Sequence, residues 1–355
     1  MNLMGIRNEN EPNKISLNKK YNYGFGLLKV YLAFIVIITH CCKMETVKNK
    51  YILLIFVKNR KIHVPSFFIM SFYFMYNNSV INNFRKLLIR LERLIIPYLG
   101  WPIIIYIFNN YVIEIIFKNN ELYSIENLKN QLLWGNIFII QFWFQWDLIM
   151  ITIMFSIFIF LINYNYLFYL QLLVFFAYFL QYSGYNMKFY KKLSHEKKEC
   201  LGRFAEVFPF TVTGFYLASI NIFYLLNFHK IKTFIFSALI FCFIENYSVF
   251  SQIKGVSYFG IDKNIKAISI IFIFSLFPSD KIKNKKLIIF LRHISNYTGG
   301  IFFLHYTVYI YFKRFCKLIK NGSFLGCINI YLICYLLCLI GAKISRKSKF
   351  KYLFG

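Results

Sequence analysis

Acidic residues are scarce in this sequence, where 14 Asp and Glu stand against 42 Lys and Arg and leave a formal net charge of +28. A charge of this size is typical of nucleic-acid-binding proteins, but its distribution argues against that class. The Lys and Arg residues form short clusters between apolar runs, where they anchor helices at anionic lipid headgroups. We therefore expect a lipid bilayer as a partner and no nucleic acid.

Paired cysteine motifs are also missing, because none of the eight cysteines forms a C-x-x-C pair. Most of them lie within apolar runs, where a free cysteine behaves as a small hydrophobic residue. The pattern indicates neither a disulfide framework nor a metal site. The first 24 residues are polar and basic and lack a cleavable signal, so the first apolar run is expected to serve as an uncleaved anchor.

Long apolar runs are what the sequence has instead, with 58% hydrophobic and 21% aromatic residues. About 20 apolar residues in a helix cross a hydrocarbon core of roughly 30 Å. The predicted fold class is all-α, a polytopic transmembrane helical bundle of about ten spans. The expected spans are 25–42, 64–80, 94–117, 137–163, 166–184, 206–224, 231–250, 265–279, 297–315 and 325–342.

The domain organisation follows from these runs. We expect a polar N-terminal tail at 1–24, one transmembrane domain at 25–342 and a basic C-terminal tail at 343–355. Residues 118–134 mix leucines with charges and are expected to form an amphipathic surface helix. Basic residues are divided almost equally between the two sides of the membrane, so charge alone leaves the orientation open.

The first span carries the first candidate site. Lys29 stands near its start and His40 near its end, eleven residues apart, which places them on one helical face roughly 16 Å apart. A histidine within an apolar span is a candidate functional residue. The alternative is a helix-end histidine near the headgroups.

Arg90 and Arg93 form the second candidate site. They are three residues apart and lie on one helical face at the start of the third span. Two guanidinium groups on one face suit a phosphate, because each offers a rigid fork of donors. The alternative is that both residues only anchor the helix at the membrane surface.

Further polar side chains interrupt other spans. An ionisable group in an apolar span must be paired, protonated or in contact with a wet cavity. Several such groups in different spans predict a shared polar cavity. The candidate cavity-lining residues are Ser71, Asp147, Glu206, Tyr297 and His305.

Five short motifs, taken in order, resemble the acyltransferase-3 family of membrane enzymes. They are Lys29-x10-His40, VPSFFIMSF at 64–72, Arg90-x-x-Arg93 followed by Pro97, QFWFQ at 141–145 and YTGGIFFLH at 297–305. Lys29 stands where Arg is commoner in the family, and Phe72 replaces the usual Gly. The motifs are spread over residues 25–310.

The resemblance implies an integral membrane enzyme, expected in the plasma membrane with its N-terminus inside. It would move an acyl group, most simply acetyl, from acyl-CoA to a hydroxyl of a carbohydrate or lipid-linked glycan. His40 would act as the general base, and Lys29, Arg90 and Arg93 would bind the CoA donor. No metal is implied. An acyl-histidine intermediate is the less favoured variant.

Two other classes of function remain open at this stage. A transporter or flippase also carries ionisable groups within its spans, although no internal repeat is visible between the two halves of the chain. A catalytically inactive family member acting as a scaffold is the other alternative, because Lys29 and Phe72 both depart from the family pattern and Lys29 lacks the fork of an arginine.

Overall fold

The computed structural model describes residues 23–52, 56, 62–78, 80, 83–113, 124–135, 142–161, 195–220, 222, 232–240, 261–276, 285–313 and 316–354. All regular elements within these residues are helices, and no strand occurs among them. The predicted all-α class is therefore confirmed for the described part of the chain.

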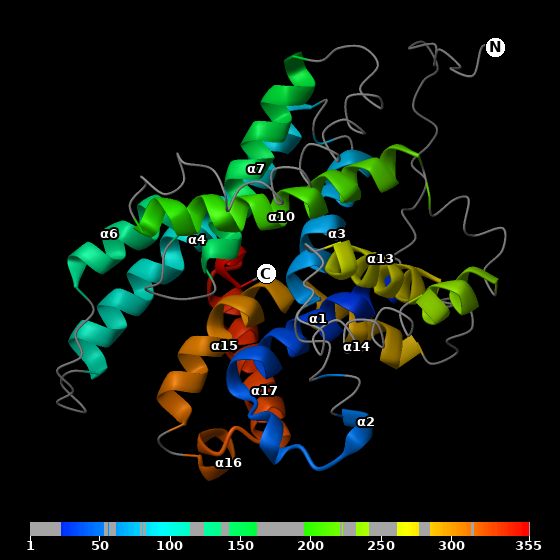
Figure 1. Ribbon diagram of the computed structural model, residues 1–355. Coiled ribbons are helices and arrows are strands. Elements are labelled where there is room, and N and C mark those ends of the chain that lie inside the picture. The colour runs from blue at the N-terminus through cyan, green and yellow to red at the C-terminus, as the bar shows by residue number, and fades with distance from the viewer. Residues whose placement is uncertain are drawn as a thin grey trace, which may run out of the picture.

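Helix α1 (Tyr23–Cys41) is the central element of the bundle. It packs against α3, α13, α14, α15 and α17, and Figure 1 shows it in blue between the other helices. Most of its side chains are buried, from Phe25 near its start to Cys41 at its end. The apolar run alone accounts for this, since a helix that is hydrophobic on all sides is surrounded by protein or lipid.

Helices α3 (His63–Asn77), α10 (His195–Ser219) and α13 (Ile261–Ser275) pack together beside α1. The contact between α3 and α10 is close, because a Cβ atom added to Gly214 of α10 would lie 2.1 Å from the Ile69 carbonyl oxygen of α3. Only glycine allows two backbones to approach so closely.

Helices α4 (Phe84–Ile107), α6 (Ile125–Trp134) and α7 (Phe142–Leu161) form another group. Asn83 caps α4 by accepting a hydrogen bond from the Lys86 amide at 3.0 Å, a typical role of Asn at a helix start. The helix thus begins ten residues before the expected span at 94–117, and Arg90 and Arg93 lie inside it. Gly135, with φ of 66°, ends α6.

The last third of the chain contains α14 (Lys285–Asn296), α15 (Thr298–Phe312), α16 (Lys317–Lys320) and α17 (Phe324–Ile344). Between α14 and α15 the chain bends by 62°. After α17, the 3₁₀ helix η6 (Lys349–Leu353) folds back and packs against α4 and α17. Shorter elements are η1 (Met44–Thr46), α2 (Lys50–Ile52) and the π-helical η4 (Phe108–Ile113).

Two helices in the described part of the chain, α1 and α17, are long and apolar enough to cross a membrane, or three if the bent pair α14–α15 is one span. Most of the other expected spans contain a described helix. The expected span 166–184 lies outside the described residues. The membrane character is supported, and the count of ten spans stays a prediction.

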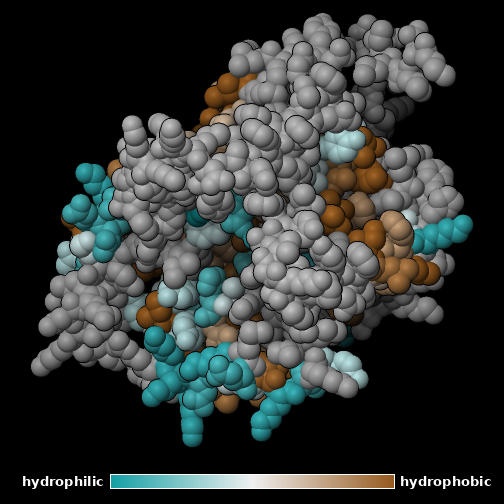
Figure 2. All heavy atoms as spheres, in the orientation of Figure 1, coloured by the Kyte–Doolittle hydropathy of each residue, from teal (hydrophilic) through white to brown (hydrophobic). Residues whose placement is uncertain are grey.

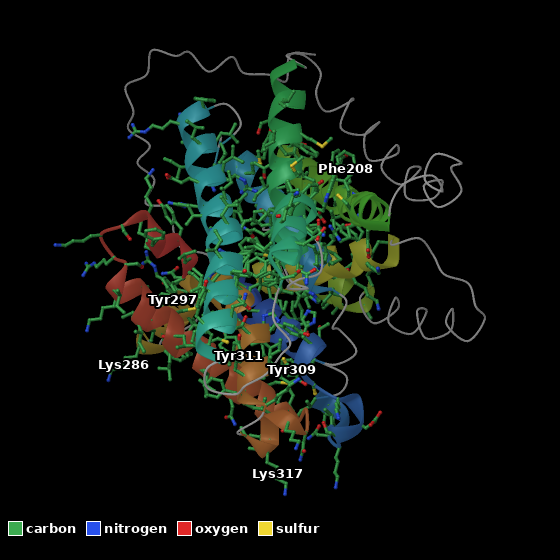
Figure 3. All side chains as sticks on the ribbon, turned by 90° about the vertical axis from the view of Figure 1, so that its left-hand side faces the viewer. Phe208, Lys286, Tyr297, Tyr309, Tyr311 and Lys317 are labelled. Atoms are coloured by element: carbon green, nitrogen blue, oxygen red, sulfur yellow. The ribbon has the colours of Figure 1, made fainter. Side chains whose placement is uncertain are left out.

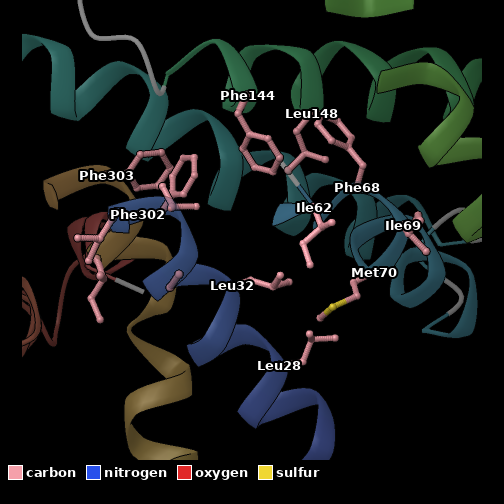
Figure 4. Packing of buried hydrophobic residues seen from close by; sticks show 14 of the residues in the cluster. Leu28, Leu32, Ile62, Phe68, Ile69, Met70, Phe144, Leu148, Phe302 and Phe303 are labelled. Carbon is pink, nitrogen blue, oxygen red and sulfur yellow. The ribbon is translucent and has the colours of Figure 1, made fainter. Parts of the chain in front are cut away.

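Aromatic side chains from several helices fill the core around α1. Phe144 of α7 lies 5.2 Å from Phe302 of α15 and 4.8 Å from Phe68 of α3, measured between ring centroids. Figure 4 shows these rings above Leu28 and Leu32 of α1. In Figure 2, hydrophilic atoms gather at the lower end of the molecule, where α2 and α16 lie in Figure 1.

Candidate active site

His40 lies in the last turn of α1, as the apolar run before it predicts. Its imidazole is half-buried, and its ring centroid lies 5.4 Å from that of His305 in α15. The Tyr306 ring stands edge-on to His40 at 6.1 Å. The structure therefore brings together two histidines that are 265 positions apart in the chain.

His305 is fully buried, and its Nδ1 lies 2.6 Å from the carbonyl oxygen of Phe302. A carbonyl oxygen can only accept, so Nδ1 carries the proton in this arrangement. Nε2 is then left with a free lone pair, and it has no hydrogen-bond partner among the described residues. An unpaired buried polar atom is rare in folded proteins and asks for an explanation.

Aromatic rings also pack near His305. Phe302 lies 6.1 Å from His305 and contacts Phe67 and Phe144. His63, at the start of α3, is nearly buried and lies within electrostatic range of His305. This apolar packing limits the access of water to the histidine pair.

Lys29 and Arg90 both reach the same stretch of α3, residues 71–74. Arg90 donates an Nη2 hydrogen bond to Ser71 Oγ at 2.8 Å, and its guanidinium lies 5.6 Å from the Phe72 ring centroid. Lys29 Nζ lies 5.9 Å from the Phe74 ring centroid. Ser71 and Phe74 are one turn apart on one helical face, so the two cations flank the same part of α3.

Arg90 also keeps unused hydrogen-bonding capacity. Its Nε is buried and has no hydrogen-bond partner within the described part of the chain. A buried cationic donor without an acceptor is unfavourable unless a ligand or water completes it. The Ser71 hydroxyl and the Arg90 guanidinium are therefore suited to hold an anion together.

Arg93, the second arginine of the motif, faces the end of the chain, residues 349–354, which we call the C-terminal segment. It is exposed, and its guanidinium lies 5.4 Å from the Tyr352 ring centroid in η6. Between the two arginines, Glu92 pairs with Lys349 of the same segment. This hydrogen bond and the opposite charge raise the pKa of Lys349 above its ordinary value.

The C-terminal segment is held in place by contacts with three helices. The Trp101 Nε1 of α4 donates to the Leu353 carbonyl oxygen at 2.9 Å, in a buried position. Phe354 packs into two notches, because a Cβ atom added to Gly300 or Gly341 would lie 2.4 Å from its carbonyl oxygen or 2.1 Å from its ring. The predicted basic tail thus includes an ordered element that contacts α4, α15 and α17.

Asp147 of α7 is fully buried next to Arg203 of α10. Its Oδ2 lies 3.9 Å from Arg203 Nε, while Arg203 Nη2 donates to the Trp134 carbonyl oxygen at 2.8 Å. Neither carboxylate oxygen of Asp147 has a hydrogen-bond partner among the described residues. The pair compensates charge, as expected for an acid in an apolar helix, and it ties α7 to α10.

Two other candidate residues lie in different surroundings. Glu206 is paired with Lys263 of α13 at 2.6 Å, and both side chains are partly exposed. Tyr297 precedes α15, where its ring contacts His293 and Tyr335. Eight residues separate Tyr297 from His305, about 12 Å along a helix. Figure 3 shows Tyr297 well apart from Tyr309, which follows His305 by about one turn of α15. The contacts described for these two side chains do not include His40.

Sequence reasoning did not assign roles to Tyr306, Arg203 or Tyr352. Tyr306 directly follows His305 at the end of the late motif, so the sequence could have indicated that it lies near the site. Arg203 and Tyr352 had none, because their partners lie 56 and 259 positions away. In the described part of the chain, no group of three His, Cys, Asp or Glu side chains is arranged to hold a metal ion.

Comparison with known proteins gives one match. A family model described as an acyltransferase domain matches residues 22–347, nearly the whole chain. No curated protein and no solved structure matches. The match includes α1, α4 and α15, the helices that carry the histidine pair, Lys29 and the two arginines.

Proposed function

The chain belongs to the acyltransferase-3 family of membrane acyltransferases, and from this premise we propose that it transfers an acyl group from acyl-CoA to a hydroxyl group of a carbohydrate or lipid-linked glycan. Acetyl is the simplest acyl group. The site of action is the plasma membrane, and the modification is O-acetylation of a polysaccharide or its lipid-linked precursor.

The observation that carries the proposal is the contact between His40 and His305. The Phe302 carbonyl holds the proton of His305 on Nδ1. The lone pair on Nε2 has no hydrogen-bond partner among the described residues and lies beside His40, so it is available to accept a hydrogen bond from one N–H of His40 during the reaction. Such a bond would leave the other nitrogen of His40 deprotonated and free for the acceptor, as a general base requires.

The reaction is a simple exchange of bonds. His40 takes the proton of the acceptor hydroxyl while the hydroxyl oxygen attacks the thioester carbonyl carbon. The carbon–sulfur bond breaks, an ester bond forms, and the proton passes to the departing CoA thiolate. Tyr306, whose ring stands 6.1 Å from that of His40, is our candidate to donate its hydroxyl proton in a hydrogen bond to the negative oxygen that develops in the transition state.

The donor binds along α1. Lys29 lies towards the other end of this helix, roughly 16 Å from His40 by helical rise, and Arg90 reaches the same stretch of α3 as Lys29. They hold phosphate groups of CoA while its long pantetheine arm extends towards the histidines. This division matches the donor, in which the charged nucleotide and the reactive thioester are the two ends of one molecule.

The test is an assay of CoA release. The purified protein in lipid nanodiscs is given acetyl-CoA and a glycan acceptor fraction, and free thiol is measured. His40→Ala is expected to lower the rate by about 10²–10⁴-fold, the usual contribution of a general base, without loss of membrane insertion. The matched control is His293→Ala, since His293 is exposed and hydrogen-bonded to Tyr335.

Two results would contradict the proposal. Full turnover in His40→Ala would remove the assigned base. Movement of a solute across the membrane without consumption of acetyl-CoA would place the protein among transporters instead. Acyl label bound covalently to His40 after acid quenching would favour the acyl-histidine variant over direct transfer.

A further inference from the structure

The C-terminal segment brings additional basic residues to α4, where the proposed donor site lies. Its anchors are apolar or backbone contacts: the Leu353 carbonyl with Trp101, and Phe354 with Gly300 and Gly341. Lys349 adds an ion pair with Glu92 of α4, whereas Lys351 takes no part in these anchoring contacts. Lys351 is exposed, and Tyr352 is half-buried.

The Tyr352 ring contacts two cations. The guanidinium of Arg93 and the Nζ of Lys351 each lie 5.4 Å from its centroid. Cations are attracted to an aromatic face, but they repel each other. The nearby acid, Glu92, is engaged with Lys349. Arg93 and Lys351 form no ion pair with an acid among the described residues, so an anion between them would relieve their repulsion.

These two cations extend the row that begins at Lys29. Arg93 follows Arg90 by one turn of α4, and Arg90 shares the 71–74 stretch of α3 with Lys29. A row of four cations matches a ligand with several phosphate groups in sequence, since each phosphate prefers its own cationic donors. In Figure 3 the red C-terminal segment lies far from Lys317 at the lower end.

We propose that Lys351 and Tyr352 form, with Arg93, a binding site for phosphate groups at the nucleotide end of the acyl donor. Lys351 contacts the phosphate directly, and the Tyr352 ring positions Lys351 and Arg93. This inference rests on the proposed function, because it takes acyl-CoA as the donor. The C-terminal segment then determines specificity for a nucleotide-bearing thioester over a shorter one.

The experiment compares two donors, acetyl-CoA and S-acetylpantetheine, which lacks the nucleotide. Lys351→Glu is expected to raise KM for acetyl-CoA about tenfold, the size of one charge-assisted hydrogen bond, and to leave kcat and the rate with S-acetylpantetheine unchanged. Tyr352→Ala is expected to raise KM several-fold, whereas Tyr352→Phe keeps the ring and the wild-type KM.

The charge-matched control is Lys317→Glu in α16, an exposed lysine at the other end of the molecule, which should leave KM for acetyl-CoA unchanged. A structural effect of the variants would lower the rate with both donors equally. Such a result, or an unchanged KM in Lys351→Glu, would overturn the inference.

Direct binding separates this inference from the proposed function. In nanodiscs of neutral lipid, wild-type protein should bind adenosine 3′,5′-diphosphate, and Lys351→Glu should bind it about tenfold more weakly. Such binding without any turnover would refute the transferase and leave the phosphate site. Normal turnover with equal nucleotide binding by both proteins, or no nucleotide binding by the wild type, would refute the site.

An anionic lipid headgroup offers the same phosphate chemistry, and the lipid composition distinguishes the two sources. If adding phosphatidylglycerol to the nanodiscs removes nucleotide binding by the wild type at low ionic strength, the site belongs to a lipid headgroup and the inference falls. Retained nucleotide binding in these nanodiscs supports the nucleotide as the ligand.

Discussion

At the scale of single residues, His305 is the clearest case of a side chain whose state is determined by its surroundings. The Phe302 carbonyl accepts from Nδ1 and leaves Nε2 as a buried base next to His40. Under the proposed mechanism His305 is a positioning residue, because it would act on the reaction only through His40. Its unpaired nitrogen is explained if it orients the catalytic imidazole.

His305→Gln should lower kcat about ten- to a hundredfold, less than His40→Ala, since general-base catalysis itself contributes about 10²–10⁴-fold. KM for acetyl-CoA should stay the same, because the basic residues are untouched. Steady-state kinetics across a pH range check this. A shift in the pH profile of kcat supports a role through His40, whereas equal losses in kcat and protein yield would indicate a packing role only.

The arginines of the R-x-x-R motif show how two identical residues acquire different surroundings. Arg90 is directed to Ser71 on α3, and Arg93 to Tyr352 in η6. Both are expected to contribute to donor binding, but at different phosphate groups. Lys29 approaches the same part of α3 as Arg90, so its positive charge is placed to act even without the fork of an arginine.

At the scale of elements, the C-terminal segment connects α4 to the start of α15. Two neighbouring glycines of α15, Gly299 and Gly300, differ in their contact with this segment. A Cβ atom at Gly300 would lie 2.4 Å from the Phe354 carbonyl oxygen, while one at Gly299 would meet nothing within 4 Å. One glycine is therefore needed for this contact, and its neighbour is not.

Gly300→Ala should lower the melting temperature and make the C-terminus more sensitive to carboxypeptidase. Overpacking of this kind destabilises a protein by about 1–3 kcal/mol. Gly299→Ala, the matched control, should be neutral or stabilising by up to about 1 kcal/mol, because alanine favours helices. Thermal unfolding in detergent measures both, and equal melting temperatures would contradict the contact.

At the scale of the whole molecule, the histidine end of α1 and the C-terminal segment lie at opposite ends of α17. The amide of Lys43, just after His40, donates to the Gly322 carbonyl oxygen at 2.8 Å, which joins the end of α1 to the loop before α17. The C-terminal segment lies beyond the other end of α17, next to the basic row. The two ends of α17 should therefore face opposite sides of the membrane.

Labelling of single added cysteines tests this arrangement. With the N-terminus inside, Lys317→Cys should react with an impermeant maleimide in intact cells, and Lys351→Cys only after permeabilisation. The parent chain provides the background signal of its own cysteines, of which Cys327, Cys334 and Cys338 are buried. Labelling of both positions in intact cells would contradict the predicted topology and the cytoplasmic access of the donor.

The sequence alone determined the helical class, the membrane character and the family, because apolar runs, helix caps and short motifs act over a few residues. It also placed Lys29 and His40 on one helix. Only the tertiary structure decided that His40 meets His305, that Arg90 meets Ser71 while Arg93 meets Tyr352, and that the C-terminal residues pack against α4. These contacts join residues from 19 to more than 250 positions apart, and they depend on how whole helices pack rather than on any local pattern.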